Sequence, residues 1–148
     1  MKNRMTFAFV LVAFGGAGAA ADGIINTENG VAIKGYDPVA YFTDSGPVKG
    51  DPQFAYEWNG AIWRFSSAEH RDAFAADPEA YAPAYGGYCA WAVAHGDIAD
   101  INPRAWYIED GRLYLNVNQI IALRWRARRD HYIEEGDRNW PEVRSRLE

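Results

Sequence analysis

The sequence of 148 residues has one cysteine, two methionines and no apolar run long enough for a membrane-spanning helix. A single cysteine cannot form an internal disulfide, which excludes a disulfide-stapled miniprotein. With 15 Lys and Arg against 20 Asp and Glu, the chain is also no strongly basic nucleic-acid binder. Its composition excludes a collagen and a coiled-coil rod. What remains is a small, acidic globular protein in which 15% of the residues are aromatic.

The first 21 residues have the three-part pattern of a secretory signal peptide. Lys2 and Arg4 give a short positive start, residues 5–14 form an apolar run, and small residues fill positions 17–21. The apolar run is too short for a transmembrane helix, which needs about 20 residues. An uncleaved anchor or a buried first helix is the alternative. We predict a signal peptide at 1–21 and a periplasmic or secreted protein.

Cleavage of this segment makes the chain more acidic. It removes Lys2 and Arg4 but no acidic residue, so 13 basic and 20 acidic residues remain and the net charge becomes −7. We therefore expect neither a nucleic acid nor an anionic membrane surface as a partner. The remaining 127 residues are enough for one hydrophobic core and too few for two. We divide them into a polar, loop-like leader at 22–30, one domain at 31–141 and a C-terminal tail at 142–148.

The clearest local pattern is a hairpin. Two aromatic-rich runs, 54–58 and 61–65, flank Asn59-Gly60, and this pair favours the tight turn of a two-residue hairpin. A helix should follow at once, because Ser66 to Glu69 fits a capping box that begins at Ser66. Asp77-Pro78 should end this helix and start another.

A second hairpin is predicted from residues 105–108 and 112–117 around Asp110-Gly111. Asn118 can cap the next helix, in which arginines 124, 126, 128 and 129 alternate with apolar residues. Together with a short strand at 31–33, this order predicts an α+β fold. It is a small single domain with antiparallel β-hairpins and several short helices.

Three sequence blocks occur in order along the chain. They are GYDPVAYF at 35–42, FSSAEHRDAF at 65–74 with DPEAY at 77–81, and YGGYCA at 85–90. With these blocks the chain resembles the exported bacterial proteins of the YHS domain family, over roughly residues 31–141. The resemblance implies a small α+β domain.

The resemblance also implies a connection with metals. Better-understood relatives are attached to ATPases that transport copper and other heavy metals, and these relatives are regarded as metal-binding. There, a cysteine follows the Asp-Pro-Val block, and a cysteine pair lies where the hairpin enters the helix. This sequence has Ala40 at the first place and Ser66 and His70 at the other two. Of these three, only His70 is able to bind a soft or borderline metal ion.

The mature chain offers one cysteine and three histidines as ligands, and a structural zinc site normally uses four such side chains. Cys89 and His95 are six residues apart, which on a continuous helix places them about 120° apart. They could face one ion only if the helix ended between them, and Gly96 favours an end nearby. We take Cys89 as the best ligand for copper or zinc, with His95 and His70 as helpers.

Each candidate ligand also has a structural interpretation. Cys89 could be a buried apolar side chain, because free cysteines are among the most buried residues. His70 could lie on a helix surface, and His95 could be a favourable charge at a helix C-terminus. His131 follows four arginines and is expected to be solvated. A homodimer that pairs two Cys89 thiols, or shares one ion, would complete a ligand set that one chain barely supplies.

Two functional hypotheses follow. The first is an exported accessory protein that binds or traffics a transition metal, copper first, through Cys89 with histidine helpers. The second is a metal-free module that binds a protein or a small apolar ligand through its aromatic residues or the arginines at 124–129. No phosphate-binding loop or nucleophile elbow is present, and a Cys-His nucleophile would need Asp97 or Asp100 to orient it. We therefore expect no enzyme.

Overall fold

Two hairpins organise the computed structural model, which describes residues 23–148. The predicted signal peptide at 1–21 lies outside the described residues. In the first hairpin, β3 (Asp51–Trp58) pairs with β4 (Ala61–Phe65) across Asn59 and Gly60, which both have positive φ. In the second, β5 (Asn102–Glu109) pairs with β6 (Arg112–Asn116) across Asp110 and Gly111, again with positive φ. Both predicted hairpins are confirmed.

The first hairpin belongs to a sheet of four strands in the order β1-β2-β4-β3. Strand β1 (Thr27–Glu28) pairs antiparallel with β2 (Val31–Ala32), and β2 is parallel to β4. Strand β1 lies inside the predicted leader at 22–30, whose other described residues are loop and turn. The Asn26 side chain donates hydrogen bonds to the Gly87 carbonyl and to Asp100, which hold this polar segment on the domain.

Short helices connect and cover the hairpins. The α-helices are α1 (Ala40–Thr43), α2 (Ala68–Ala76), α3 (Ala90–Ala94), α4 (Gln119–Ala127) and α5 (Arg129–Ser145), and the 3₁₀ turns are η2 (Ile33–Gly35), η3 (Pro78–Ala80) and η4 (Ala84–Gly87). No helix among residues 23–148 combines the length and apolar character needed to cross a membrane.

The ends of the helices follow the predicted caps with one correction. Asn118 caps α4 by accepting a hydrogen bond from the Ile121 amide at 2.9 Å, as predicted. Helix α2 is capped by Ser67, one residue later than expected, because the Ser66 side chain is hydrogen-bonded elsewhere. The predicted C-terminal tail at 142–148 begins within α5, where Val143 is buried.

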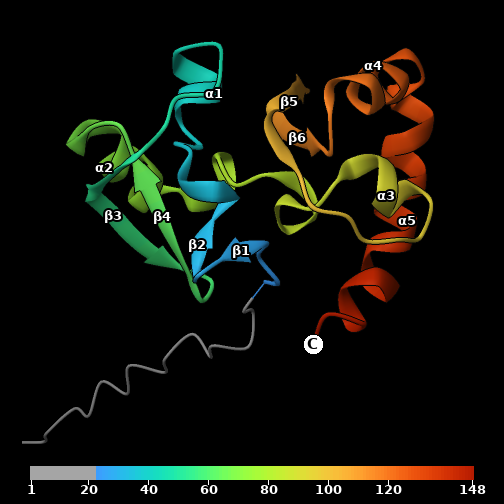
Figure 1. Cartoon of the computed structure of the whole chain (residues 1–148), viewed down its shortest axis with the longest axis horizontal. Coiled ribbons are helices and arrows are strands. Elements are labelled where there is room, and N and C mark those ends of the chain that lie inside the picture. Colours follow the sequence, from blue (N-terminus) through green and yellow to red (C-terminus); the bar gives the residue numbers. More distant parts are fainter. Residues whose placement is uncertain (1–22) are drawn as a thin grey trace, which may run out of the picture.

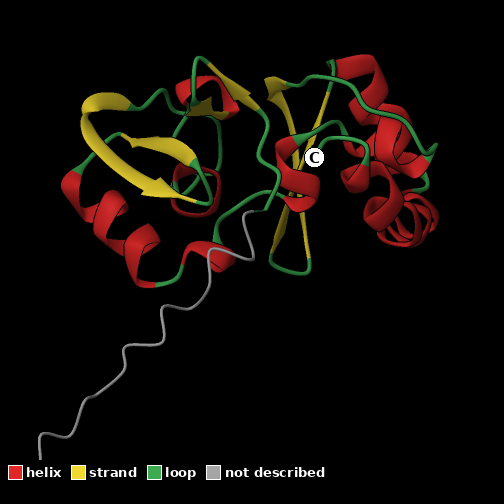
Figure 2. Ribbon diagram, turned by 90° about the horizontal axis from the view of Figure 1, so that it is seen from below, coloured by secondary structure: helices red, strands yellow, loops and turns green. Residues whose placement is uncertain are grey.

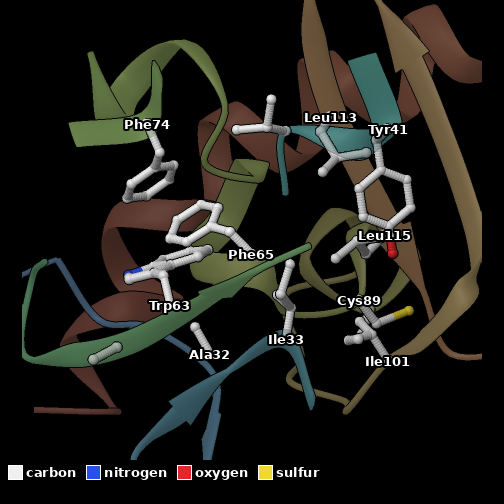
Figure 3. Close-up of a cluster of buried hydrophobic side chains, with 13 residues drawn as sticks. Ala32, Ile33, Tyr41, Trp63, Phe65, Phe74, Cys89, Ile101, Leu113 and Leu115 are labelled. Carbon is white, nitrogen blue, oxygen red and sulfur yellow. The ribbon is translucent and has the colours of Figure 1, made fainter. Parts of the chain in front are cut away.

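One hydrophobic core joins the two hairpins. Trp63 and Phe65 of β4 pack on Phe74 of α2, each with 5.1 Å between ring centroids. Leu113 and Leu115 of β6 belong to the same buried cluster, as does Cys89 (Figure 3). Because side chains from both sheets share this core, the chain is one α+β domain, as predicted.

A second buried cluster lies beneath the C-terminal helices. It contains Tyr114 of β6, Trp125 of α4 and Val143 of α5. The first sheet with α1 and α2 therefore forms one half of the molecule, and β5 and β6 with α3, α4 and α5 form the other (Figures 1 and 2).

The chain turns sharply at η4, where Tyr85 and Gly86 both have positive φ. The Gly86 carbonyl accepts a hydrogen bond of 2.8 Å from the Asn26 amide. A Cβ atom at Gly86 would collide with the carbonyl oxygen of Ile24, so the close approach of the N-terminal segment requires glycine here.

Candidate functional site

A buried carboxylate organises the junction between the first loop and helix α2. Asp37 has no exposed surface. One of its oxygens, Oδ1, accepts hydrogen bonds from the amides of Val39 at 2.8 Å and Ala40 at 3.2 Å. These two amides start helix α1, whose first N–H groups have no partners within the helix. Asp37 therefore fixes the loop that leads into α1.

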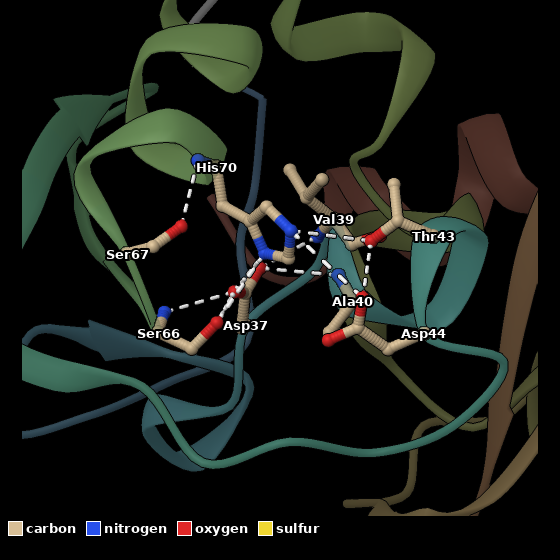
Figure 4. A network of polar contacts seen from close by, with 8 residues as sticks. All are labelled: Asp37, Val39, Ala40, Thr43, Asp44, Ser66, Ser67 and His70. Atoms are coloured by element: carbon tan, nitrogen blue, oxygen red, sulfur yellow. Dashed lines mark hydrogen bonds and ion pairs between the residues drawn. The ribbon is translucent and has the colours of Figure 1, made fainter.

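The other oxygen of Asp37 reaches across to the end of β4. It accepts hydrogen bonds from the Ser66 amide at 2.9 Å and from the Ser66 hydroxyl at 2.8 Å. It also lies 2.6 Å from Nδ1 of His70 (Figure 4). Because an ionised carboxylate only accepts hydrogen bonds, Nδ1 carries the hydrogen and donates a hydrogen bond to Asp37. Five donors thus converge on one buried side chain, which compensates for its removal from water.

Local sequence explains how His70 arrives at this position. Strand β4 ends at Phe65, and Ser67 accepts a hydrogen bond of 3.1 Å from the His70 amide to begin α2. Residues on the first turn of α2 are thereby held close to Ser66, whose hydroxyl lies 3.3 Å from His70 Nδ1. The Ser67 cap thus holds the His70 backbone, and the Asp37 carboxylate holds its imidazole.

The outer nitrogen of His70 faces helix α1. Its Nε2 atom lies 3.2 Å from the Thr43 hydroxyl oxygen and 3.9 Å from Oδ1 of Asp44. The His70 side chain is 18% exposed and that of Asp44 is 45% exposed, so this side of the imidazole is close to solvent. We call Asp37, Thr43, Asp44 and His70 the His70 corner (Figure 4).

Cys89 lies away from solvent, with 1% of its surface exposed (Figure 3). Its Sγ atom donates to Oδ1 of Asn116 at 3.5 Å, and the same oxygen accepts a hydrogen bond of 2.9 Å from the Trp91 amide. Burial raises the pKa of the Cys89 thiol above its ordinary value, although backbone hydrogen bonds oppose the shift. The surroundings of Cys89 thus favour the neutral thiol, which is a poor metal ligand.

His95 occupies a third environment. It follows the last residue of the short helix α3, with Gly96 at positive φ after it, so the predicted helix end is confirmed. Its Nδ1 atom lies 2.7 Å from the Trp91 carbonyl, and its ring stacks on that of Trp91 with 4.6 Å between centroids. It also packs near Tyr132, with 5.7 Å between ring centroids.

The three predicted ligands therefore have different neighbours. Cys89 contacts the side-chain amide of Asn116, His95 contacts the Trp91 ring, and His70 contacts the Asp37 carboxylate. Between residues 23 and 148 there is no group of three or more His, Cys, Asp or Glu side chains arranged to hold a metal ion. Of the three, His70 alone has a carboxylate on each side of its ring.

Sequence reasoning missed the acidic residues of the His70 corner. In the sequence, Asp37 stands out only as part of the block GYDPVAYF at 35–42, and Asp44 belongs to none of the three blocks. The signal that could have found Asp37 is its place before Pro38 and α1, because aspartate at such a position commonly accepts hydrogen bonds from the amides that follow. Its pairing with His70 is tertiary and leaves no pattern in the local sequence.

Comparison with known proteins gives this chain no relative. No family model matches it, and neither does any curated protein or solved structure. The resemblance carried by the three sequence blocks therefore stays a prediction, and function is argued below from the site.

Proposed function

We propose that this is an exported accessory protein that binds a divalent transition metal ion weakly and reversibly at the His70 corner. The export part rests on residues 1–21, and it implies a periplasmic or secreted protein. The observation that carries the metal part is the 2.6 Å contact between Asp37 and Nδ1 of His70. It leaves Nε2 as the nitrogen that faces helix α1, 3.2 Å from the Thr43 hydroxyl and 3.9 Å from Oδ1 of Asp44.

The arrangement has the form of a histidine prepared as a metal ligand. Histidines that bind metals almost always donate their other ring N–H to a carboxylate, a backbone carbonyl or water, which fixes the tautomer and makes the ring more basic. Asp37 supplies that carboxylate. Zinc lies about 2.1 Å from nitrogen and oxygen ligands, so two atoms 3.9 Å apart, such as Nε2 of His70 and Oδ1 of Asp44, can contact one ion.

The resemblance to the YHS family supports the same place in the fold. The three positions at which the relatives carry cysteines are Ala40, Ser66 and His70 here. In this structure the Ala40 amide, the Ser66 hydroxyl and the His70 ring all hydrogen-bond to Asp37. The chain thus has a hydrogen-bonded carboxylate at the point where relatives would gather thiolates.

The donor atoms also indicate which metal to expect. Imidazole and carboxylate ligands suit zinc and copper(II), whereas copper(I) prefers thiolate and thioether sulfur. One imidazole and one carboxylate leave most of the coordination shell to water, and structural zinc sites use four protein ligands. We therefore expect weak binding, of the kind that suits transfer rather than storage.

The test is a zinc and copper(II) titration in competition with a chromophoric chelator, on the mature protein and its variants. His70→Gln should abolish binding, and Asp44→Asn should weaken it at least about tenfold, because even the loss of a group that only supports a metal ligand typically costs that much. Cys89→Ser and His95→Gln are the matched controls and should bind like the unchanged protein. Asp44 is half exposed, so its substitution keeps the test valid even if His70→Gln fails to fold.

Two outcomes contradict the proposal. One is a protein that binds neither ion at submillimolar concentration. The other is binding that survives His70→Gln but is lost in Cys89→Ser or His95→Gln, which would return the site to the residues first selected from the sequence.

A second candidate function is a metal-free module that binds another protein. A specific observation favours it: helix α4 carries large apolar side chains on its solvent side. This surface is independent of the His70 corner.

A further inference from the structure

Helix α4 is apolar on two opposite sides. Its inner side places Ala122 and Trp125 in the second buried cluster. On its outer side Ile120 is 66% exposed and Leu123 is 63% exposed. Ala127 follows four residues after Leu123 and is also exposed, so residues 120, 123 and 127 share one face at helical spacing. We call these three residues the outer stripe.

Arginines lie on both sides of the outer stripe. At about 100° per residue, Arg124 falls on one flank beside Ile120, and Arg126 falls on the other flank beside Leu123. The Arg126 guanidinium lies 4.7 Å from the centre of the Tyr107 ring. A cation over an aromatic face is held in place, so Arg126 is partly ordered before any partner arrives.

A cleft adjoins the flank that carries Arg126. It has a volume of about 510 Å³ and is lined by Trp106, Tyr107 and Ile108 of β5 together with Arg104, Gln119 and Arg126. The Gln119 amide donates a hydrogen bond of 2.8 Å to the Arg104 carbonyl, which ties the start of α4 to β5. The cleft is therefore lined by two arginines together with two aromatic residues and one aliphatic residue.

The arginines of this surface form no ion pairs with the residues that the structure describes. In the part of the chain from residue 23 onward, no carboxylate pairs with Arg104, Arg124 or Arg126. Glu109 of β5 is paired with Arg129 at 2.8 Å. The whole chain has a net charge of −5, so this surface is a local region of opposite charge. Electrostatic complementarity then selects a negatively charged partner.

We propose that the outer stripe and the adjoining cleft dock an acidic, amphipathic segment of a partner protein. Its apolar side chains would cover Ile120 and Leu123, and its carboxylates would pair with Arg104, Arg124 and Arg126. An amphipathic helix laid on an apolar face with charged flanks is a recurrent mode of peptide recognition. A lipid surface fits less well, because two aliphatic side chains bury little apolar area and the rest of the protein is acidic.

The probe is a fluorescein-labelled amphipathic peptide of leucine and glutamate, followed by fluorescence anisotropy on the mature protein. Binding should weaken about tenfold in Leu123→Ser and in Arg126→Gln, since each removes one central contact. It should weaken further as salt is added. The same peptide with lysine in place of glutamate should not bind. Arg138→Gln is the matched charge control, because Arg138 lies on α5 with Glu134 and Glu135 as partners.

Three results would overturn the proposal. The first is a peptide affinity that is unchanged in both Leu123→Ser and Arg126→Gln. The second is binding to vesicles of phosphatidylglycerol with no binding to the peptide, which would make the surface a membrane contact. The third is a dimer in sedimentation equilibrium that Leu123→Ser dissociates, which would make the occupant a second copy of this chain. Leu123 and Arg126 are exposed, so both variants should fold, and circular dichroism verifies it.

Discussion

Nδ1 of His70 lies 2.6 Å from the Asp37 carboxylate, although 33 residues separate them in the chain. The pair connects the loop before α1 to the first turn of α2. Asp37 also accepts a hydrogen bond from the Val39 amide at the start of α1. The His70 amide donates a hydrogen bond to the side chain of Ser67, which caps α2. One contact therefore fixes two helix starts relative to each other.

Replacing the buried carboxylate by an amide should be costly. In Asp37→Asn an NH₂ group would face the Ser66 and His70 donors, and the charge that pairs with His70 would be lost. We expect the free energy of unfolding to fall by about 3 kcal/mol, which urea denaturation measures. Asp44→Asn, at an exposed position, should change it by about 0.5 kcal/mol or less. A loss below about 1 kcal/mol in Asp37→Asn would mean that the network is not a main support of the fold.

The thiol of Cys89 should be protected in the folded protein. It is buried, and burial raises its pKa, so little thiolate is present and reagents reach it only through opening of the structure. Alkylation by iodoacetamide should be at least about a hundredfold slower in buffer than in urea. Mass spectrometry of quenched samples follows the reaction. Labelling at comparable rates in the two conditions would show that Cys89 is accessible.

Acid should weaken the attachment of the N-terminal segment. Burial opposes ionisation of Asp100, but hydrogen bonds from Lys34, Asn26 and the Ile101 amide outweigh it and lower the pKa of Asp100 below 3.8. The stabilisation is therefore complete above pH 3.8 and is lost as the pH falls through the lower folded-state value. Urea midpoints between pH 5 and pH 2 should fall less steeply in Asp100→Asn than in the unchanged protein. Equal slopes would contradict this role for Asp100.

Two glycines with positive φ make a matched pair of substitutions. Gly60 has open space where a Cβ would lie, so Gly60→Ala should cost only the backbone strain, about 1 kcal/mol. At Gly86 the added Cβ would also collide with the Ile24 carbonyl, so Gly86→Ala should lose at least about 2 kcal/mol. Thermal unfolding compares the two variants. Limited proteolysis should cut near Ile24 more readily in Gly86→Ala than in Gly60→Ala or the unchanged protein. Equal cleavage of both variants would contradict the close approach of Ile24 to Gly86.

The local structure was largely predictable from the sequence, because its signals are local. Asn59-Gly60 and Asp110-Gly111 specify hairpins through the positive φ that their turns need, and Asn118 specifies a helix start through its side-chain acceptor. The cap of α2 was placed one residue early because Ser66 and Ser67 are both good caps. Only the tertiary bond from Ser66 to Asp37 decides between them.

The candidate site was predictable in part only. His70 was identified by its residue type, but its selection over Cys89 depends on burial and partners that no spacing reveals. The parallel pairing of β2 with β4 was likewise hidden, since it brings Val31 beside Ile62 across the intervening α1 and β3. The same holds for the outer stripe: the alternation of arginines with apolar residues was visible, but which apolar residues face solvent was not.

The hydrogen bond between Asn26 and Asp100 spans 74 positions of the chain. During synthesis the ribosome releases residue 26 long before residue 100. Asn26 therefore cannot form its hydrogen bond to Asp100 until most of the domain has been synthesised. Closing so long a loop also has an entropic cost, and this cost is offset only when the later contacts form. The segment around Asn26 is therefore among the last described parts to reach its final place, and a nascent chain shortened before Asp100 should be unable to fold completely.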